Sequence, residues 1–118
     1  MKKIETLKKL KIGLHYHIPV LLKNDKIYTS AFFGVFVDSI AKNCDEIIFY
    51  AYTACESEKK NMDYLVQKRN VKIYNLGILK RFSFIKIKFN NKQKKQIIKS
   101  FNQLDLIILR APTALSFL

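Results

Sequence analysis

The apolar and polar positions of the chain form two kinds of pattern. Residues 12–22 are almost continuously apolar, which is typical of a strand buried on both faces in a parallel sheet, so we expect a first strand at residues 11–22. The polar residues 23–26 then predict a loop. Apolar positions at three- and four-residue spacing predict a helix that begins at Thr29 or Ser30 and ends near residue 43. Its inward face consists of Phe33, Phe36, Val37, Ile40 and Ala41.

Three later segments have the composition of strands. Residues 47–53 are rich in aromatic and β-branched side chains. Residues 71–76 form an apolar run that Gly77 ends, and residues 104–109 form the last such run. Residues 82–89 alternate between apolar and polar or basic positions, which fits either an edge strand or an extended loop. We therefore expect four or five strands.

Two further helical patterns separate these strands. Residues 56–69 predict a short, mostly polar helix, and its inward residues are Met62, Leu65 and Val66. Residues 90–102 predict a helix with a narrow apolar stripe, formed by Ile97, Ile98 and Phe101. In the first expected helix, which ends near residue 43, Gly34 lies off the apolar face. Its missing side chain gives another backbone or a ligand room to approach.

The order of the elements indicates an α/β fold. Strands that alternate with helical segments predict a parallel sheet with right-handed crossovers. We expect one Rossmann-like domain over residues 1–118, with three αβα layers and a mostly parallel sheet of four or five strands. Residues 114–118 resemble the beginning of a helix, and isolated short helices are marginal in water. This ending predicts the N-terminal piece of a longer protein, truncated at its C-terminal end.

The positive charge is concentrated in one part of the chain. Of 118 residues, 22 are Lys or Arg and 9 are Asp or Glu, which gives a net charge of +13. Eleven of the basic residues lie between Tyr64 and Leu104, where no acidic residue occurs. Such a stretch either attracts nucleic acid, anionic lipid or a phosphorylated ligand, or is simply a solvated lysine-rich surface. The candidate anion or membrane patch consists of Lys80, Arg81, Lys86, Lys88, Lys92, Lys94 and Lys95.

The composition also limits compartment and cofactor. Hydrophobic residues make up 49% of the chain, as in globular proteins, and the longest charge-free runs are too short for a membrane span, which needs about 20 residues. Cys44 and Cys55 have no CxxC spacing, so we expect neither a disulfide framework nor a zinc site, and the reducing cytoplasm is the default compartment. The motifs GxGxxG, GxxxxGK[ST], GxSxG and HExxH are all missing, so we predict no cofactor.

Two histidines lie near the expected carboxyl end of the first strand, where open parallel sheets bind their ligands. His15 and His17 are two residues apart, so on a strand their side chains would share one face. That spacing fits either two metal ligands or two histidines of the core. No acidic residue or cysteine lies at short spacing to complete a metal site, and we predict none.

Four other polar residues stand at strand ends or helix starts. Arg110 closes the last strand before Pro112 and Thr113, which fits either a site for an anion or sugar hydroxyls or a surface arginine beside a helix start. Thr29 and Ser30 fit either a ligand contact or a helix cap. The candidate substrate-binding residues are therefore His15, His17, Thr29, Ser30, Arg110 and Thr113, and no catalytic residue is predicted.

Three segments carry a resemblance to a known family. Residues 28–41 read YTSAFFGVFVDSIA and residues 45–48 read DEII, and together they resemble the first helix and second strand of GT-B-fold glycosyltransferases. Residues 105–116 read DLIILRAPTALS and are similar to that family's strand ending in Arg-x-Pro-Ser/Thr. The pattern looks like the N-terminal domain of the large retaining class typified by glycogen synthases and bacterial polysaccharide enzymes.

The resemblance implies a function and partners. In that family the N-terminal domain receives a glycan or lipid-linked acceptor, and a C-terminal domain binds the nucleotide-sugar. The resemblance covers only the acceptor side of such an enzyme, so it implies an acceptor-side domain that would lack the donor domain and be inactive alone. By the same resemblance, the basic stretch would dock on the anionic cytoplasmic face of the membrane. The alternative is a small basic domain that binds nucleic acid or a membrane surface, because aromatic and basic residues interleave at residues 82–89.

Overall fold

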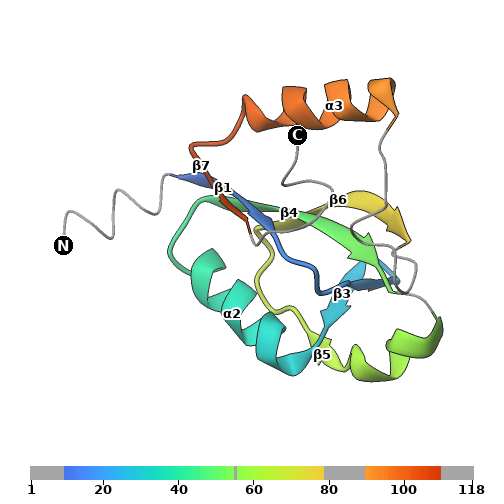
Figure 1. Cartoon of the computed structure of the whole chain (residues 1–118). Coiled ribbons are helices and arrows are strands. Elements are labelled where there is room, and N and C mark those ends of the chain that lie inside the picture. Colours follow the sequence, from blue (N-terminus) through green and yellow to red (C-terminus); the bar gives the residue numbers. More distant parts are fainter. Residues whose placement is uncertain (1–9, 55, 79–89, 110–118) are drawn as a thin grey trace.

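The computed structural model describes residues 10–54, 56–78 and 90–109, and Figure 1 shows their arrangement. The described part is a mixed α/β structure with two sheets and two α-helices. The elements in chain order are β1 (Lys11–His15), β2 (Leu21–Lys23), β3 (Lys26–Thr29), α2 (Ala31–Ala41), β4 (Glu46–Thr53), the 3-10 helix η1 (Glu56–Asn61), β5 (Tyr64–Leu65), β6 (Val71–Ile78), α3 (Asn91–Phe101) and β7 (Leu106–Leu109).

The main sheet has four strands in the order β6-β4-β1-β7, and every neighbouring pair is parallel. The predicted parallel sheet is therefore confirmed. Strand β1 is central: the chain first adds β4 and β6 on one side of it and then crosses to add β7 on the other side. A parallel sheet that reverses its direction of growth has a topological switch point, which here lies between β1 and β7. This arrangement is compatible with a Rossmann-like fold.

The two helices lie on opposite sides of the main sheet (Figure 1). Phe33, Val37 and Ala41 of α2 belong to a buried cluster with Ile47 and Phe49 of β4. On the other side, Ile97 of α3 forms a smaller cluster with Tyr50, against which Phe101, Leu104 and Ile107 pack. The alternation of side chains along β4 explains this division, because successive residues of a strand point to opposite faces.

The first strand is shorter than predicted. It ends at His15, and the chain then leaves the ladder before Val20 returns to pair with Thr53 at the far end of β4. The Val20 amide donates to the Tyr52 carbonyl at 2.8 Å, and the Ala54 amide donates to the Val20 carbonyl at 2.8 Å. Pro19 has no amide hydrogen to donate to a sheet ladder, so an uninterrupted strand over residues 11–22 was the wrong interpretation of this apolar run.

The structure also contains a second sheet that the sequence did not predict. It has three antiparallel strands in the order β2-β3-β5. The predicted loop at residues 23–26 is a tight hairpin turn, in which Lys23 pairs with Lys26. Asn24 and Asp25 have φ angles of 51° and 64°, as a two-residue turn of type I′ requires at both of its central residues. The helix predicted over residues 56–69 is wrong: η1 is followed by β5, which adds to this hairpin.

The remaining differences are local. Strand β6 continues through Gly77 rather than ending there, and Gly77 adopts a φ of 97°. Ile98 was predicted to face inward, but its side chain is 49% exposed because α3 buries only the neighbouring Ile97. Phe36 was also predicted to face inward, but it is 37% exposed, since the sheet-facing side of α2 is centred on Phe33 and Val37. The alternating segment at residues 82–89 and the helix start at residues 113–118 lie outside the described residues.

Candidate functional site

The carboxyl edge of the main sheet is the place where parallel α/β sheets bind ligands. His15 ends β1 and pairs with Leu109, the last residue of β7, so the two strands flanking the switch point end together. Thr53 and Gly77 stand near the ends of β4 and β6 at the same edge. The carboxyl ends of the described strands therefore lie along one edge of the sheet, and His15 lies at that edge as expected.

His15 is fully buried at this edge and is held in one orientation. Its Nδ1 donates to the Tyr50 carbonyl at 2.7 Å, since a carbonyl oxygen can only accept. Burial is the main cause that lowers the pKa of His15, with a smaller lowering by the charge of His17, against a raising effect of the Tyr50 bond. The imidazole is therefore neutral at pH 7. The Tyr52 ring lies edge-on to it, with 5.8 Å between the ring centroids.

The predicted histidine pair is not formed on one strand. The strand ends at His15, and His17 is an exposed residue of the following bend, so the alternation that would have placed both rings on one face does not reach it. Within residues 10–54, 56–78 and 90–109, no group of three His, Cys, Asp or Glu side chains is arranged to hold a metal ion.

Thr29 and Ser30 lie at the start of α2, and Thr29 makes a hydrogen bond within the fold. The Thr29 hydroxyl is buried and donates to the Pro19 carbonyl at 3.0 Å, which ties the start of α2 to the segment after β1. Ser30 is the N-cap residue of α2, but its side chain makes no capping hydrogen bond. Arg110 and Thr113 lie outside the described residues, as do Lys80, Arg81, Lys86 and Lys88 of the predicted patch.

Tyr52 carries a polar group without a partner. Its side chain is fully buried on β4, and its hydroxyl has no hydrogen-bond partner among the residues that the structure describes. Burial also raises the pKa of Tyr52, so the phenol is neutral. A buried hydroxyl without a partner costs free energy. Tyr52 and the neighbouring His15 therefore place two polar side chains in the buried interior beneath the carboxyl edge.

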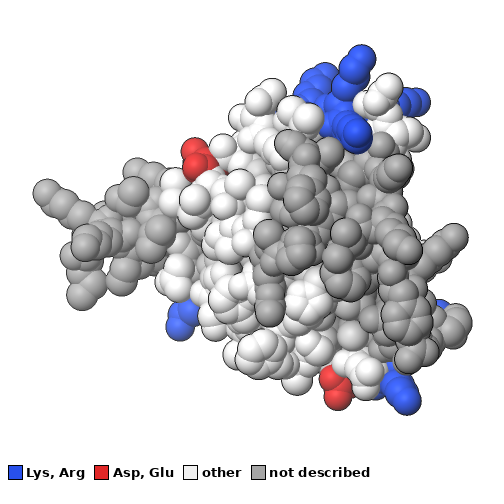
Figure 2. Space-filling model, viewed as in Figure 1, with Lys and Arg blue, Asp and Glu red and all other residues white. Residues whose placement is uncertain are grey.

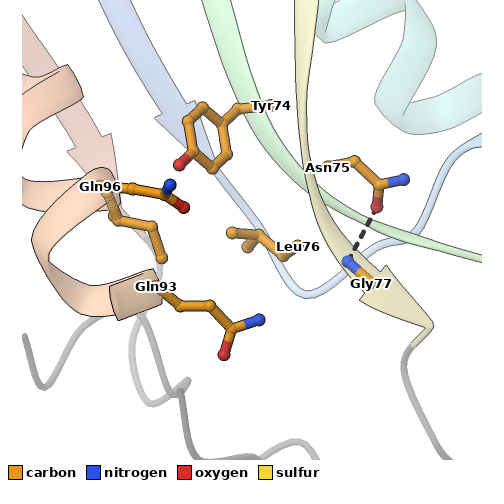
Figure 3. Close-up of a pocket in the computed structure, with 7 residues that line it drawn as sticks. Tyr74, Asn75, Leu76, Gly77, Gln93 and Gln96 are labelled. Carbon is orange, nitrogen blue, oxygen red and sulfur yellow. Dashed lines mark hydrogen bonds between the residues drawn. The ribbon is translucent and has the colours of Figure 1, made fainter. Parts of the chain in front are cut away.

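A pocket of about 300 Å³ lies between the second half of β6 and the first half of α3. We call it the amide pocket. The described residues that line it are all uncharged: Tyr74, Asn75, Leu76, Gly77, Gln93, Gln96 and Ile97. In Figure 3 the side chains of Tyr74, Gln93 and Gln96 converge from the strand and the helix, and Leu76 lies between them. The pocket thus has an apolar floor and a polar rim.

Local hydrogen bonds fix the walls of the amide pocket. The Asn75 side chain points away from the glutamines (Figure 3), and its Oδ1 accepts from the Gly77 amide at 2.8 Å and from the Thr53 hydroxyl at 3.1 Å. On the helix side, Gln93 Oε1 accepts from the Asn90 amide at 2.9 Å, as part of a capping box. These bonds leave the Gln93 NH2 group without a partner among the described residues.

Two further polar groups of the pocket are available to a ligand. Neither the Tyr74 hydroxyl nor the side-chain amide of Gln96 makes a hydrogen bond to another described residue. The sequence did not predict Tyr74, Gln93 and Gln96 as site residues, because they come together only when α3 packs beside β6. One local signal was present: Asn90 followed by Gln93 is a capping-box spacing that marks the start of α3.

The described part of the predicted basic patch is confined to α3. Lys92, Lys94 and Lys95 are exposed on this helix, and Figure 2 shows basic side chains gathered over it. Whether this patch docks on a membrane surface stays a prediction.

Comparisons with protein-family models, with curated proteins and with solved structures found no match. Among the described residues, no helix is long and apolar enough to cross a membrane. The amide pocket and the switch point at the carboxyl edge are the two features on which the proposed function rests.

Proposed function

We propose that this chain is a carbohydrate-binding Rossmann-like domain with three αβα layers, which acts as the acceptor side of a GT-B glycosyltransferase. In this proposal a separate donor domain binds the nucleotide-sugar. The observation that carries the proposal is an uncharged pocket at the carboxyl half of an edge strand, in a chain with a net charge of +13. The parallel sheet with its switch point supports it as the framework on which such ligands bind.

The chemistry of the amide pocket suits a sugar. The Gln96 side-chain amide can donate and accept, and the Gln93 NH2 group can donate, so both residues can bond hydroxyl groups, which do both. The Tyr74 hydroxyl adds a third such group, and Leu76 offers an apolar surface for the C–H face of a sugar ring. A volume of about 300 Å³ stands at the small end of ligand pockets, which suits one or two sugar units.

The role of the described residues is to bind and orient, and no step of sugar transfer is assigned to them. Held by the pocket, the acceptor would present a hydroxyl across the carboxyl edge toward the switch point between β1 and β7. There the neutral His15 and the buried Tyr52 form a polar spot beside apolar residues.

A binding experiment with the full chain tests this proposal. Amide chemical shifts are followed by NMR during titration with maltohexaose, and we expect the largest changes at residues 74–77 and 93–97. Replacing Gln96→Ala should weaken binding about fivefold, because one hydrogen bond contributes about 1 kcal/mol. Gln103→Ala is the matched control, since Gln103 is an exposed glutamine that does not line the pocket.

Nucleic-acid binding is the second candidate, and the exposed lysines of α3 favour it. A single-stranded DNA 20-mer in the same titration separates the two. If DNA binds with a steep loss of affinity in salt while maltohexaose causes no shifts in the pocket, the carbohydrate proposal is wrong.

A further inference from the structure

The surface of α3 carries positive charge that the described residues do not neutralise. The helix contains no acidic residue, and its first turn, where acidic side chains stabilise a helix, contains a lysine instead. None of its lysines forms an ion pair with a residue that the structure describes. The lysines near its start disfavour the isolated helix, whereas Lys99 stands in the last turn, where a positive charge is favourable. The helix exposes four positive charges in all: Lys92, Lys94, Lys95 and Lys99.

Three of these lysines form a row along α3 that borders Gln96, one of the residues that line the amide pocket. Lys92 and Lys99 are four residues before and three residues after Gln96, so both neighbour Gln96 on the helix surface. Lys95 is three residues from Lys92 and four from Lys99, so it belongs to the same row. It lies about 100° around the helix from Gln96 and so extends the row away from the pocket. We call Lys92, Lys95 and Lys99 the lysine row. Lys94 projects about 160° around the helix from Gln96 and so lies on another side.

The geometry points to an acceptor glycan that is itself anionic, and this inference rests on the proposed function. The amide pocket would bind the hydroxyl groups of one unit, and the lysine row would bind carboxylate or phosphate groups of the units that follow. Lys92 and Lys99 are separated by seven residues, or about 10.5 Å along the helix axis, which suits an extended chain with repeated charges better than a single small anion.

The surface of α3 fits a glycan better than a nucleic acid. Proteins that bind single strands stack bases on exposed aromatic side chains. Phe101 is the aromatic residue of α3, and it is half-buried against the ring of Tyr50, with 5.3 Å between centroids. The exposed large apolar residue on this helix is Ile98, which has no aromatic face. The row therefore offers charge without a stacking platform.

The test compares matched ligands on the full chain by calorimetry in 50 mM salt. Hexagalacturonate supplies carboxylates, poly(ribitol phosphate) supplies phosphates, and maltohexaose is the neutral control. We expect at least one of the two anionic chains to bind ten times more tightly than maltohexaose, with an advantage that shrinks at 500 mM salt because the charges are screened. The stronger of the two identifies the anionic group.

Variants separate the two proposals. The triple variant Lys92→Gln, Lys95→Gln, Lys99→Gln should remove the preference for the anionic chain and leave maltohexaose binding unchanged, whereas Lys94→Gln should keep the preference. Gln96→Ala should weaken both kinds of sugar equally. A thermal melt by circular dichroism checks that each variant is folded.

The possible failures are distinguishable. Equal binding of all three chains, unaffected by the triple variant, would overturn the anionic acceptor and leave the proposed function standing. Absence of any sugar binding would overturn both. Equally tight binding of inorganic polyphosphate that is insensitive to Gln96→Ala would show a general polyanion surface and also overturn the inference.

Discussion

Helices α2 and α3 are each 11 residues long and lie on opposite sides of the same sheet, but they are stabilised by different interactions. Helix α2 buries five residues and has no side-chain hydrogen bond at its N-cap. Helix α3 buries only Ile97 and begins with a complete capping box between Asn90 and Gln93. A helix with a wide buried face does not need a cap, whereas a helix with one buried residue depends on local hydrogen bonds.

The same contrast extends to the surroundings of the helices. Asp38 of α2 is buried and accepts from the Tyr64 hydroxyl at 2.7 Å and from the amides of Gln67 and Lys68 at about 3.0 Å. The Tyr64 ring packs on Gly34, where an added Cβ would lie 2.7 Å from the Tyr64 Cε1 atom. The α2 side is thus held by packing and buried hydrogen bonds, while α3 has a narrow buried face beside the amide pocket and exposed lysines on its surface. The proposed function places its ligand on the α3 side, in the amide pocket.

The largest effect is expected from the core of α2. Phe33 is fully buried and contacts the rings of Tyr16 and Phe49, with centroid distances of 4.9 and 5.2 Å. Phe33→Ala should lower the free energy of unfolding by about 3–5 kcal/mol, measured by urea denaturation. The neighbouring Phe32 is 84% exposed, so Phe32→Ala is the control and should change stability by less than about 0.5 kcal/mol. Equal losses in the two variants would contradict the packing of α2.

A smaller loss is expected when the carboxylate of α2 is removed. Asp38→Ala deprives the Tyr64 hydroxyl and two backbone amides of their acceptor, so it should cost about 2 kcal/mol in urea denaturation. Ser39→Ala, at the next and exposed position, should cost only a few tenths of a kcal/mol. If Asp38→Ala is as mild as the control, the segment after β5 is not anchored through this residue.

The free energy of unfolding should depend on pH through the buried His15. Because burial lowers the pKa of His15 in the folded state, the unfolded state binds more protons once the pH falls below the ordinary histidine pKa of about 6.5. The free energy of unfolding should therefore be level above that pH and fall as the pH drops through the range below it. His15→Gln should flatten this part of the profile, and the exposed His17→Gln should retain it. A wild-type profile parallel to that of His15→Gln would exclude a neutral buried imidazole.

The sequence predicted the framework wherever one segment forms one element. The parallel strands, α2 and α3 follow directly from apolar runs and helical spacing at residues 47–53, 31–41 and 91–101. It failed where tertiary pairing decides the structure. Residues 21–29 combine a hairpin turn with two short strands, and β5 forms only because β3 is beside it. The one local signal of the hairpin is the Asn24-Asp25 pair, since these two residue types tolerate the positive φ angles of such a turn.

The candidate site was predicted only in its position. Strand ends at the carboxyl edge were expected from chain order, and His15 lies there. The amide pocket could not be predicted, because Tyr74 and Gln96 are 22 residues apart and meet only when α3 packs on β6. His15 and His17 were read as a pair, but the strand ends between them, and the position of a strand end is set by its neighbours rather than by its own residues.

The smallest effect is expected at the N-cap residues, where the two helices differ in their hydrogen bonds. Asn90→Ala removes the side-chain acceptor for the Gln93 amide, which lies 2.7 Å from Asn90 Oδ1, and should cost about 1 kcal/mol in thermal or urea denaturation. Ser30→Ala at the equivalent position of α2 should cost only a few tenths, because Ser30 makes no such bond. The loss at Asn90 should also weaken maltohexaose binding, since the capping box holds Gln93 at the wall of the amide pocket. If both alanines cost the same, burial does not replace capping in α2, and the assignment of α3 as the locally stabilised helix is wrong.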